Sequence, residues 1–88
     1  MGFGGLKKTV MDEKIKNYVE SVAKNKGKEI DLNTDLFAEF IFDSLEIILF
    51  IEFLKTELNM EISVEDLKFE NFQSLESIMS WINSNSNV

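Results

Sequence analysis

The chain has 88 residues, 44% of them hydrophobic, and it contains neither cysteine nor histidine. This length accommodates one domain, and the missing residue types exclude disulfides, zinc sites built on Cys and His, and histidine-based catalytic triads within it. The formal net charge of −7 is unevenly distributed, because residues 1–30 carry +3 and residues 31–88 carry −10. The acidic part disfavours nucleic acid and favours a basic partner surface.

The sequence predicts neither a membrane span nor a secretory signal. No apolar run approaches the roughly 18 residues that a spanning helix needs, and the first residues lack the apolar core of a signal peptide. We therefore expect a cytoplasmic monomer.

The first predicted element is a helix over residues 10–25. Residues 1–9 have three glycines, two lysines and no periodicity, so we expect a flexible N-terminus there. From residue 10 onward, apolar residues recur at spacings of three and four, which is typical of an amphipathic helix. Lys24 and Lys26 suit the negative end of its dipole, and Gly27 predicts its end. The apolar stripe consists of Met11, Ile15, Tyr18, Val19 and Val22.

A long connection over residues 26–42 follows. It is longer than most helix-to-helix loops, and its many apolar residues predict a loop packed on the core with a short helical turn near 35–40. These residues are Ile30, Leu32, Leu36, Phe37, Phe40 and Ile41. Asp31, Asn33 and Asp35 have the spacing that opens a calcium-binding loop, but Leu36 and Phe42 stand where that loop needs Gly and Glu. We therefore interpret these polar residues as turn and cap residues and expect no metal site.

The second predicted helix, residues 44–58, is the most apolar segment. One face should join the core, with Ile47, Phe50, Ile51, Leu54 and Leu58. A second face carries Leu45, Ile48, Leu49 and Glu52. Either this face serves a partner, or rotation of the helix buries Ile48 and Leu49.

Two further helices complete the prediction. Ser63 is expected to cap a short third helix near 64–69, with Ile62, Leu67, Phe69 and Phe72 filling the gap between the long helices. Ser74 is expected to cap a fourth helix over about 75–83, on which Leu75, Ile78, Met79, Trp81 and Ile82 are apolar. The polar residues 84–88 should form a flexible tail, so residues 10–83 would be the folded domain.

The stretch Asp43-Ser44-Leu45-Glu46 begins the most apolar helix and carries the main functional signal. A serine there has an exposed hydroxyl, and the positive end of the helix dipole favours a phosphate attached to it. The simpler interpretation is a helix cap. Catalysis by this chain is not expected, because its carboxylates are not paired in an apolar pocket and its glycines do not follow a strand.

This stretch, the order of the helices and the segment Phe72-Gln73-Ser74-Leu75 resemble the acyl and peptidyl carrier protein family over residues 11–83. The resemblance implies an all-α four-helix bundle with a long first loop and a short third helix. It also implies that Ser44, flanked by Asp43 and Leu45, receives 4'-phosphopantetheine from coenzyme A through a separate transferase. The thiol of that arm would hold an acyl or aminoacyl group as a thioester.

Two departures from the family's pattern bear on the kind of carrier protein that we expect. Ile41 and Phe42 stand where many members have glycine, and Ile48 and Leu49 occupy part of a face that is strongly acidic in fatty-acid carriers. We expect a specialised acyl carrier of a fatty-acid, polyketide or secondary-metabolite pathway. It would meet loading and transfer enzymes with basic or apolar docking surfaces through Leu45, Glu46, Ile48, Leu49 and Glu52. The alternatives are an aminoacyl carrier of nonribosomal peptide type and an unmodified helical interaction module.

Overall fold

The computed structural model describes residues 3–86, with side chains described over residues 10–84. Over residues 3–86 the chain is all-helical and contains no strand, as predicted. The elements, in chain order, are α1 (Phe3–Asn25), α2 (Ser44–Glu57), the 3-10 turn η1 (Val64–Asp66), α3 (Phe69–Phe72) and α4 (Leu75–Ser86).

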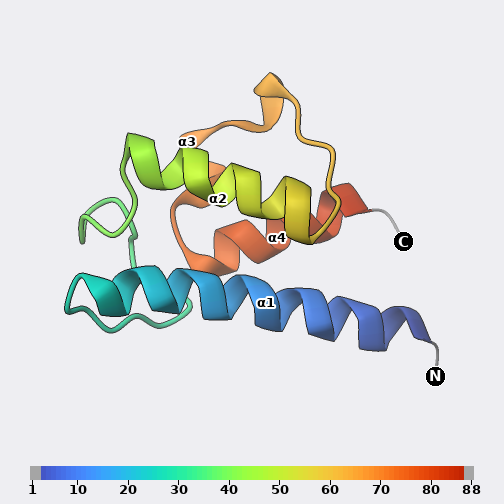
Figure 1. The fold of residues 1–88 in the computed structure, drawn as a ribbon, viewed down its shortest axis with the longest axis horizontal. Coiled ribbons are helices and arrows are strands. Elements are labelled where there is room, and N and C mark those ends of the chain that lie inside the picture. The colour runs from blue at the N-terminus through green and yellow to red at the C-terminus, as the bar shows by residue number, and fades with distance from the viewer. Residues whose placement is uncertain (1–2, 87–88) are drawn as a thin grey trace.

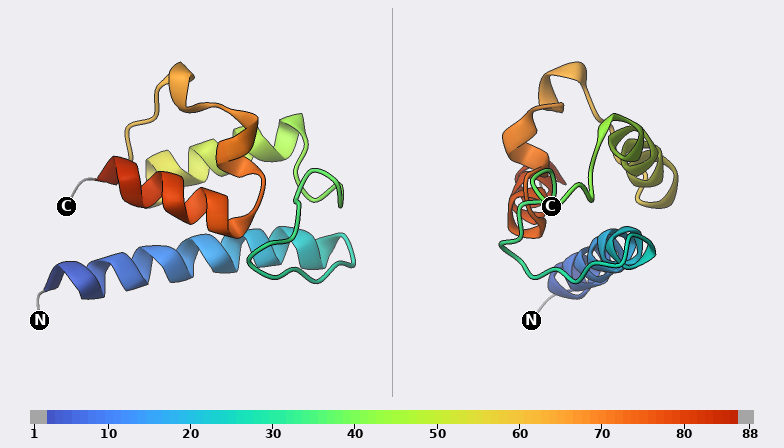
Figure 2. Two further views of the ribbon diagram at one scale, coloured as in Figure 1. Left: turned by 180° about the vertical axis from the view of Figure 1, so that it is seen from behind. Right: turned by 90° about the vertical axis from the view of Figure 1, so that its left-hand side faces the viewer.

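Three long helices frame the molecule. In the end-on view of Figure 2, α1, α2 and α4 occupy the corners of a triangle. Figure 1 shows α2 running opposite to α1, so the start of α2 lies at the far end of the bundle from the start of α1. The short α3 directly precedes α4 and packs against it, and its Phe72 also meets Phe50 of α2. No helix within residues 3–86 is long and apolar enough to cross a membrane.

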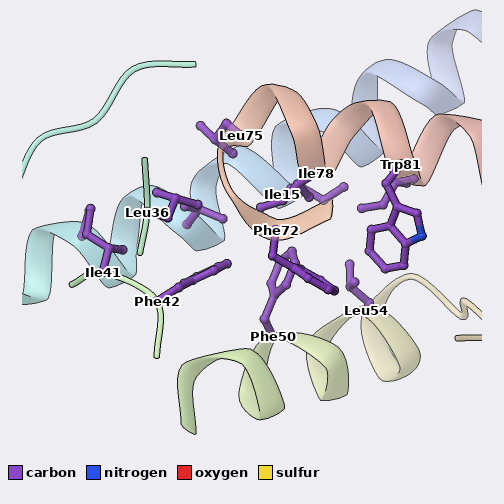
Figure 3. Close-up of a cluster of buried hydrophobic side chains, with 13 residues drawn as sticks. Ile15, Leu36, Ile41, Phe42, Phe50, Leu54, Phe72, Leu75, Ile78 and Trp81 are labelled. Carbon is purple, nitrogen blue, oxygen red and sulfur yellow. The ribbon is translucent and has the colours of Figure 1, made fainter. Parts of the chain in front are cut away.

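The core lies between these helices and is rich in aromatic rings (Figure 3). Both predicted core faces are confirmed at their centres, because Ile15 and Val19 of α1 and Phe50 and Leu54 of α2 are fully buried. The other core side chains come from the end of α1, the α1–α2 connection, α3 and α4, and they are Ala23, Leu36, Ile41, Phe42, Phe72, Leu75, Ile78, Trp81 and Ile82.

The first and last helices are longer than predicted. α1 begins at Phe3 rather than near residue 10, and α4 continues to Ser86 rather than ending near residue 83. A helix whose apolar face is packed can extend into neighbouring residues, because adding a residue to an existing helix costs less than starting one. The predicted flexibility of residues 1–9 and 84–88 concerns motion and stays a prediction. Residues 1–2 and 87–88 lie outside the described part.

The predicted third helix at 64–69 is wrong in its bounds. Ser63 does begin a turn, since Asp66 Oδ2 accepts hydrogen bonds from Ser63 N and Oγ, both at 3.1 Å. That turn ends at Asp66, because Lys68 adopts an extended backbone (φ −109°, ψ 142°), and a separate helix starts at Phe69. Phe72 is buried as expected, whereas Leu67 and Phe69 are exposed rather than filling the core.

The α1–α2 connection is attached to the core by a few residues. Leu36 and Ile41 are fully buried as predicted, but Leu32 and Phe40 are exposed, which corrects their assignment to the core. Residues 36–40 form turns, and the short helical turn predicted near 35–40 is present as a single helical hydrogen bond, from Glu39 N to Asp35 O at 3.0 Å. Backbone bonds join this loop to the α3–α4 junction, from Leu36 N to Gln73 O at 2.8 Å and from Glu76 N to Leu32 O at 3.0 Å.

Candidate functional site

The start of α2 is capped by Asp43. Its extended backbone (φ −139°, ψ −170°) precedes the helix, and Asp43 Oδ1 accepts a hydrogen bond from Glu46 N at 2.9 Å. The carbonyl oxygen of Asp43 accepts from Ile47 N, also at 2.9 Å. The Asp43 side chain therefore satisfies Glu46 N, one of the first-turn donors that have no partner within the helix, and the bond from Ile47 N is the first of the helix's own bonds.

Ser44 is the first residue of α2 and is exposed. Within residues 3–86, no hydrogen bond to the Ser44 hydroxyl is formed. The simpler interpretation, in which Ser44 is the cap, is therefore wrong, because Asp43 performs that role. An exposed hydroxyl at the positive end of a 14-residue helix is suited to carry an attached phosphate.

The turn before Asp43 contains no glycine. Ile41 and Phe42, which stand at the expected glycine positions, are buried in the core. The left-handed backbone conformation instead falls on Phe40, with a φ of 61°. Sequence reasoning placed Phe40 in the core, but its side chain is 77% exposed.

Lys26 lies beside this turn and was not identified from the sequence as a site residue. Its Nζ donates to Ile41 O at 3.0 Å and to Phe40 O at 3.3 Å. The same Nζ lies 3.6 Å from Glu46 Oε2. The sequence indicated only a lysine near the end of a helix, and the contact depends on how the loop folds back over that end.

The predicted partner face is exposed. Leu45, Ile48 and Leu49 are 62%, 60% and 46% exposed, so the alternative in which α2 rotates to bury Ile48 and Leu49 is not observed. Three neighbouring apolar side chains on one side of a helix form the kind of patch that binds partners. Three other apolar side chains are also exposed, but Val64 begins η1, Leu67 follows it and Phe69 begins α3.

The two acids expected on that face differ in their surroundings. Glu52 is exposed, whereas the side chain of Glu46 is 20% exposed and pairs with Lys26. Of these two carboxylates, Glu52 is thus the one that a basic partner could meet without first displacing Lys26.

The acidic residues of the α1–α2 loop form turns, as the sequence suggested. Asp31 Oδ1 accepts hydrogen bonds from Asn33 N at 2.9 Å and Thr34 Oγ1 at 3.0 Å. Asp35 Oδ1 accepts from Ala38 N at 3.0 Å and Phe37 N at 3.1 Å. These bonds lower the pKa of both carboxyl groups, the largest effect coming from Asn33 N for Asp31 and from Ala38 N for Asp35. In the described part of the chain, no acidic group is arranged to hold a metal ion.

Comparison with known families gives one match. A family model described as a phosphopantetheine attachment site matches residues 13–82, which is most of the chain and includes the start of α2. Proteins of this family carry covalently attached 4'-phosphopantetheine, and their domains are carriers without catalytic activity of their own. No protein of curated function matches the chain.

Proposed function

The chain belongs to this family of phosphopantetheine-binding carrier proteins, and we propose that Ser44 is the residue that bears the arm. The observation that carries the proposal is that Asp43, and not Ser44, caps α2. Asp43 caps the helix through its carboxylate, so the neighbouring Ser44 hydroxyl is exposed and free to react. The helix dipole then favours the phosphate in the product.

The attachment requires an enzyme, because no side chain in the described part of the chain accepts a hydrogen bond from the Ser44 hydroxyl. A phosphopantetheinyl transferase would bring coenzyme A to Ser44, and Oγ would form a bond to the phosphorus that bears the pantetheine arm. The pyrophosphate bond of coenzyme A would break at the same phosphorus, adenosine 3',5'-bisphosphate would leave, and the hydroxyl proton would pass to a base of the transferase. The arm ends in a thiol, which holds cargo as a thioester. Asp43 and Leu45 flank the attachment point and would contact the transferase and the arm.

The cargo is proposed to be an acyl group in a specialised fatty-acid, polyketide or secondary-metabolite pathway. The composition of α2 supports this, because Ile48 and Leu49 replace part of an acidic partner face with exposed apolar surface. Loading and transfer enzymes would bind Leu45, Ile48 and Leu49 through apolar contacts, and Glu52 would attract their basic residues. The protein would work as a cytoplasmic monomer, released from each enzyme after transfer.

The test is a change in intact mass. Incubation with coenzyme A, magnesium and a broad-specificity phosphopantetheinyl transferase should add the mass of one arm to the wild-type protein. Ser44→Ala should gain nothing, and Ser80→Ala, which removes an exposed serine of α4, should be modified like the wild type. An unmodified wild type beside a modified control carrier would contradict the proposal and leave an interaction module that uses Leu45, Ile48 and Leu49 directly.

Acyl and aminoacyl cargo are distinguished by a second assay on the modified protein. Adenylating enzymes that activate fatty acids should load the arm, and those that activate amino acids should not. The reverse result would establish the aminoacyl alternative while retaining the role of Ser44.

A further inference from the structure

The turn that leads into α2 is closed by backbone hydrogen bonds, from Phe40 N to Phe37 O and from Ile41 N and Phe42 N to Leu36 O, and it contains one unusual backbone conformation. Phe40 has a φ of 61°, in the left-handed region that a residue with a Cβ rarely adopts. Its ring is 77% exposed, so packing of that ring does not hold the turn in place. A conformation of this kind persists only where surrounding groups impose it.

Lys26 supplies contacts on both sides of Ser44. Its Nζ donates to the carbonyl oxygens of Phe40 and Ile41, at 3.3 and 3.0 Å, on the N-terminal side. On the C-terminal side it pairs with Glu46 at 3.6 Å, in the first turn of α2. One ammonium group thus joins the strained turn to the helix that begins with Ser44, and hydrogen bonds from a charged donor are stronger than neutral ones.

The position of Lys26 is itself defined by the end of α1. Gly27, with a φ of 74°, closes the helix, and its N–H donates to Lys24 O at 2.9 Å. Lys28 N donates to Ala23 O at 2.9 Å, which completes a capping arrangement common at helix ends. Since Ala23 is buried in the core, the end of α1 is anchored, and Lys26 extends from it toward the turn that leads into α2.

We infer that Lys26 is a positioning residue for Ser44: it holds the turn and the first turn of α2 in the arrangement that a phosphopantetheinyl transferase binds. This inference rests on the proposed attachment at Ser44. Without Lys26 the turn would occupy other conformations as well. The transferase would bind only the fraction in the native arrangement, which raises the apparent KM and leaves kcat nearly unchanged.

The chain offers a matched control in Lys28. Its Nζ lies 3.4 Å from Glu39 Oε1 in the same loop, with both side chains more exposed than those of Lys26 and Glu46. Lys26→Met and Lys28→Met remove the same charge, but only the first removes the contacts to the carbonyl oxygens of Phe40 and Ile41 and to Glu46. We expect Lys26→Met to raise the KM of the transferase for the carrier about tenfold, a modest value for misplacing a reacting group. Lys28→Met should leave KM near the wild-type value, and Lys26→Arg should restore most of the loss.

Amide hydrogen exchange at Glu46 and Ile47 gives a readout that does not depend on modification. Both amides are bonded to Asp43 in the first turn of α2, and both should exchange faster in Lys26→Met than in Lys28→Met. Equal KM values for the two variants would overturn the inference. A higher KM with unchanged exchange would also overturn it, because Lys26 would then contact the transferase directly. If the wild type accepts no arm, the proposed function fails, and the exchange rates alone decide whether Lys26 orders the turn.

Discussion

At the scale of single residues, Asp43 and Ser44 have separate roles that the sequence alone did not distinguish. Both residue types are common helix caps, so either could have capped α2. The structure assigns the cap to Asp43, whose carboxylate accepts from Glu46 N. The proposed modification of Ser44 would therefore leave the cap of the helix in place.

Removing the Asp43 carboxylate should destabilise the fold by a measurable amount. Asp43→Ala should lower the free energy of unfolding by about 1 kcal/mol, the usual cost of replacing a capping side chain by alanine. Asp43→Asn keeps an oxygen that can accept from Glu46 N, so its stability should stay close to that of the wild type. Urea unfolding followed by circular dichroism measures both. Equal losses in the two variants would mean that the charge of Asp43, and not its cap, stabilises α2.

At the scale of secondary-structure elements, the features that depend on the spacing of apolar residues were predicted correctly. The core faces of α1 and α2 follow from regular spacing, and α2 begins at Ser44 as predicted. The break at Lys68 did not follow, because the segments on either side of it, η1 and α3, are too short to show a period. Lys26 could not be found from sequence either, because its partners are 14 to 20 positions away and are brought close only by the fold of the loop.

The α1–α2 loop makes the fold sensitive to acid through Asp35. Its carboxylate accepts from Ala38 N, from Gln73 Nε2 at 3.2 Å and from Phe37 N, and these bonds lower its pKa in the folded state. In the unfolded chain the pKa returns to about 3.9. The stabilisation is therefore present above about pH 4 and is lost as the pH falls through the lower, folded pKa.

Asp35→Asn tests the direction of this pH dependence. Asp35 is only partly buried, so the effect should be small, but the stability difference between wild type and variant should shrink from about pH 6 to about pH 3. Urea unfolding at several pH values measures that difference. A difference that stays constant or grows toward acid pH would contradict the assignment.

At the scale of the whole molecule, an aromatic cluster joins the elements that position the site. The centroid of the Phe50 ring lies 5.4 Å from the ring centroid of Tyr18 on α1 and 5.5 Å from that of Phe42, just before α2. It lies 6.2 Å from the ring centroid of Phe72 on α3. Figure 3 shows Phe50 pointing from α2 into the centre of the core. α2 thus presents exposed apolar side chains on one face while its opposite face fixes the helix to three other segments.

Phe50→Ala should remove a large part of the stability of the domain. The free energy of unfolding should fall by about 3–5 kcal/mol, because the substitution would leave a cavity in the core between α2 and its neighbours. Domains of this kind have only about 5–15 kcal/mol of stability in total. Phe50→Leu, which fills more of the space, should lose less, and Ile48→Ala, on the exposed side of the same helix, should change stability by no more than about 0.5 kcal/mol. Urea unfolding of the three variants measures the order of their stabilities. If Ile48→Ala were as destabilising as Phe50→Ala, the exposed face of α2 would belong to the core rather than to a partner.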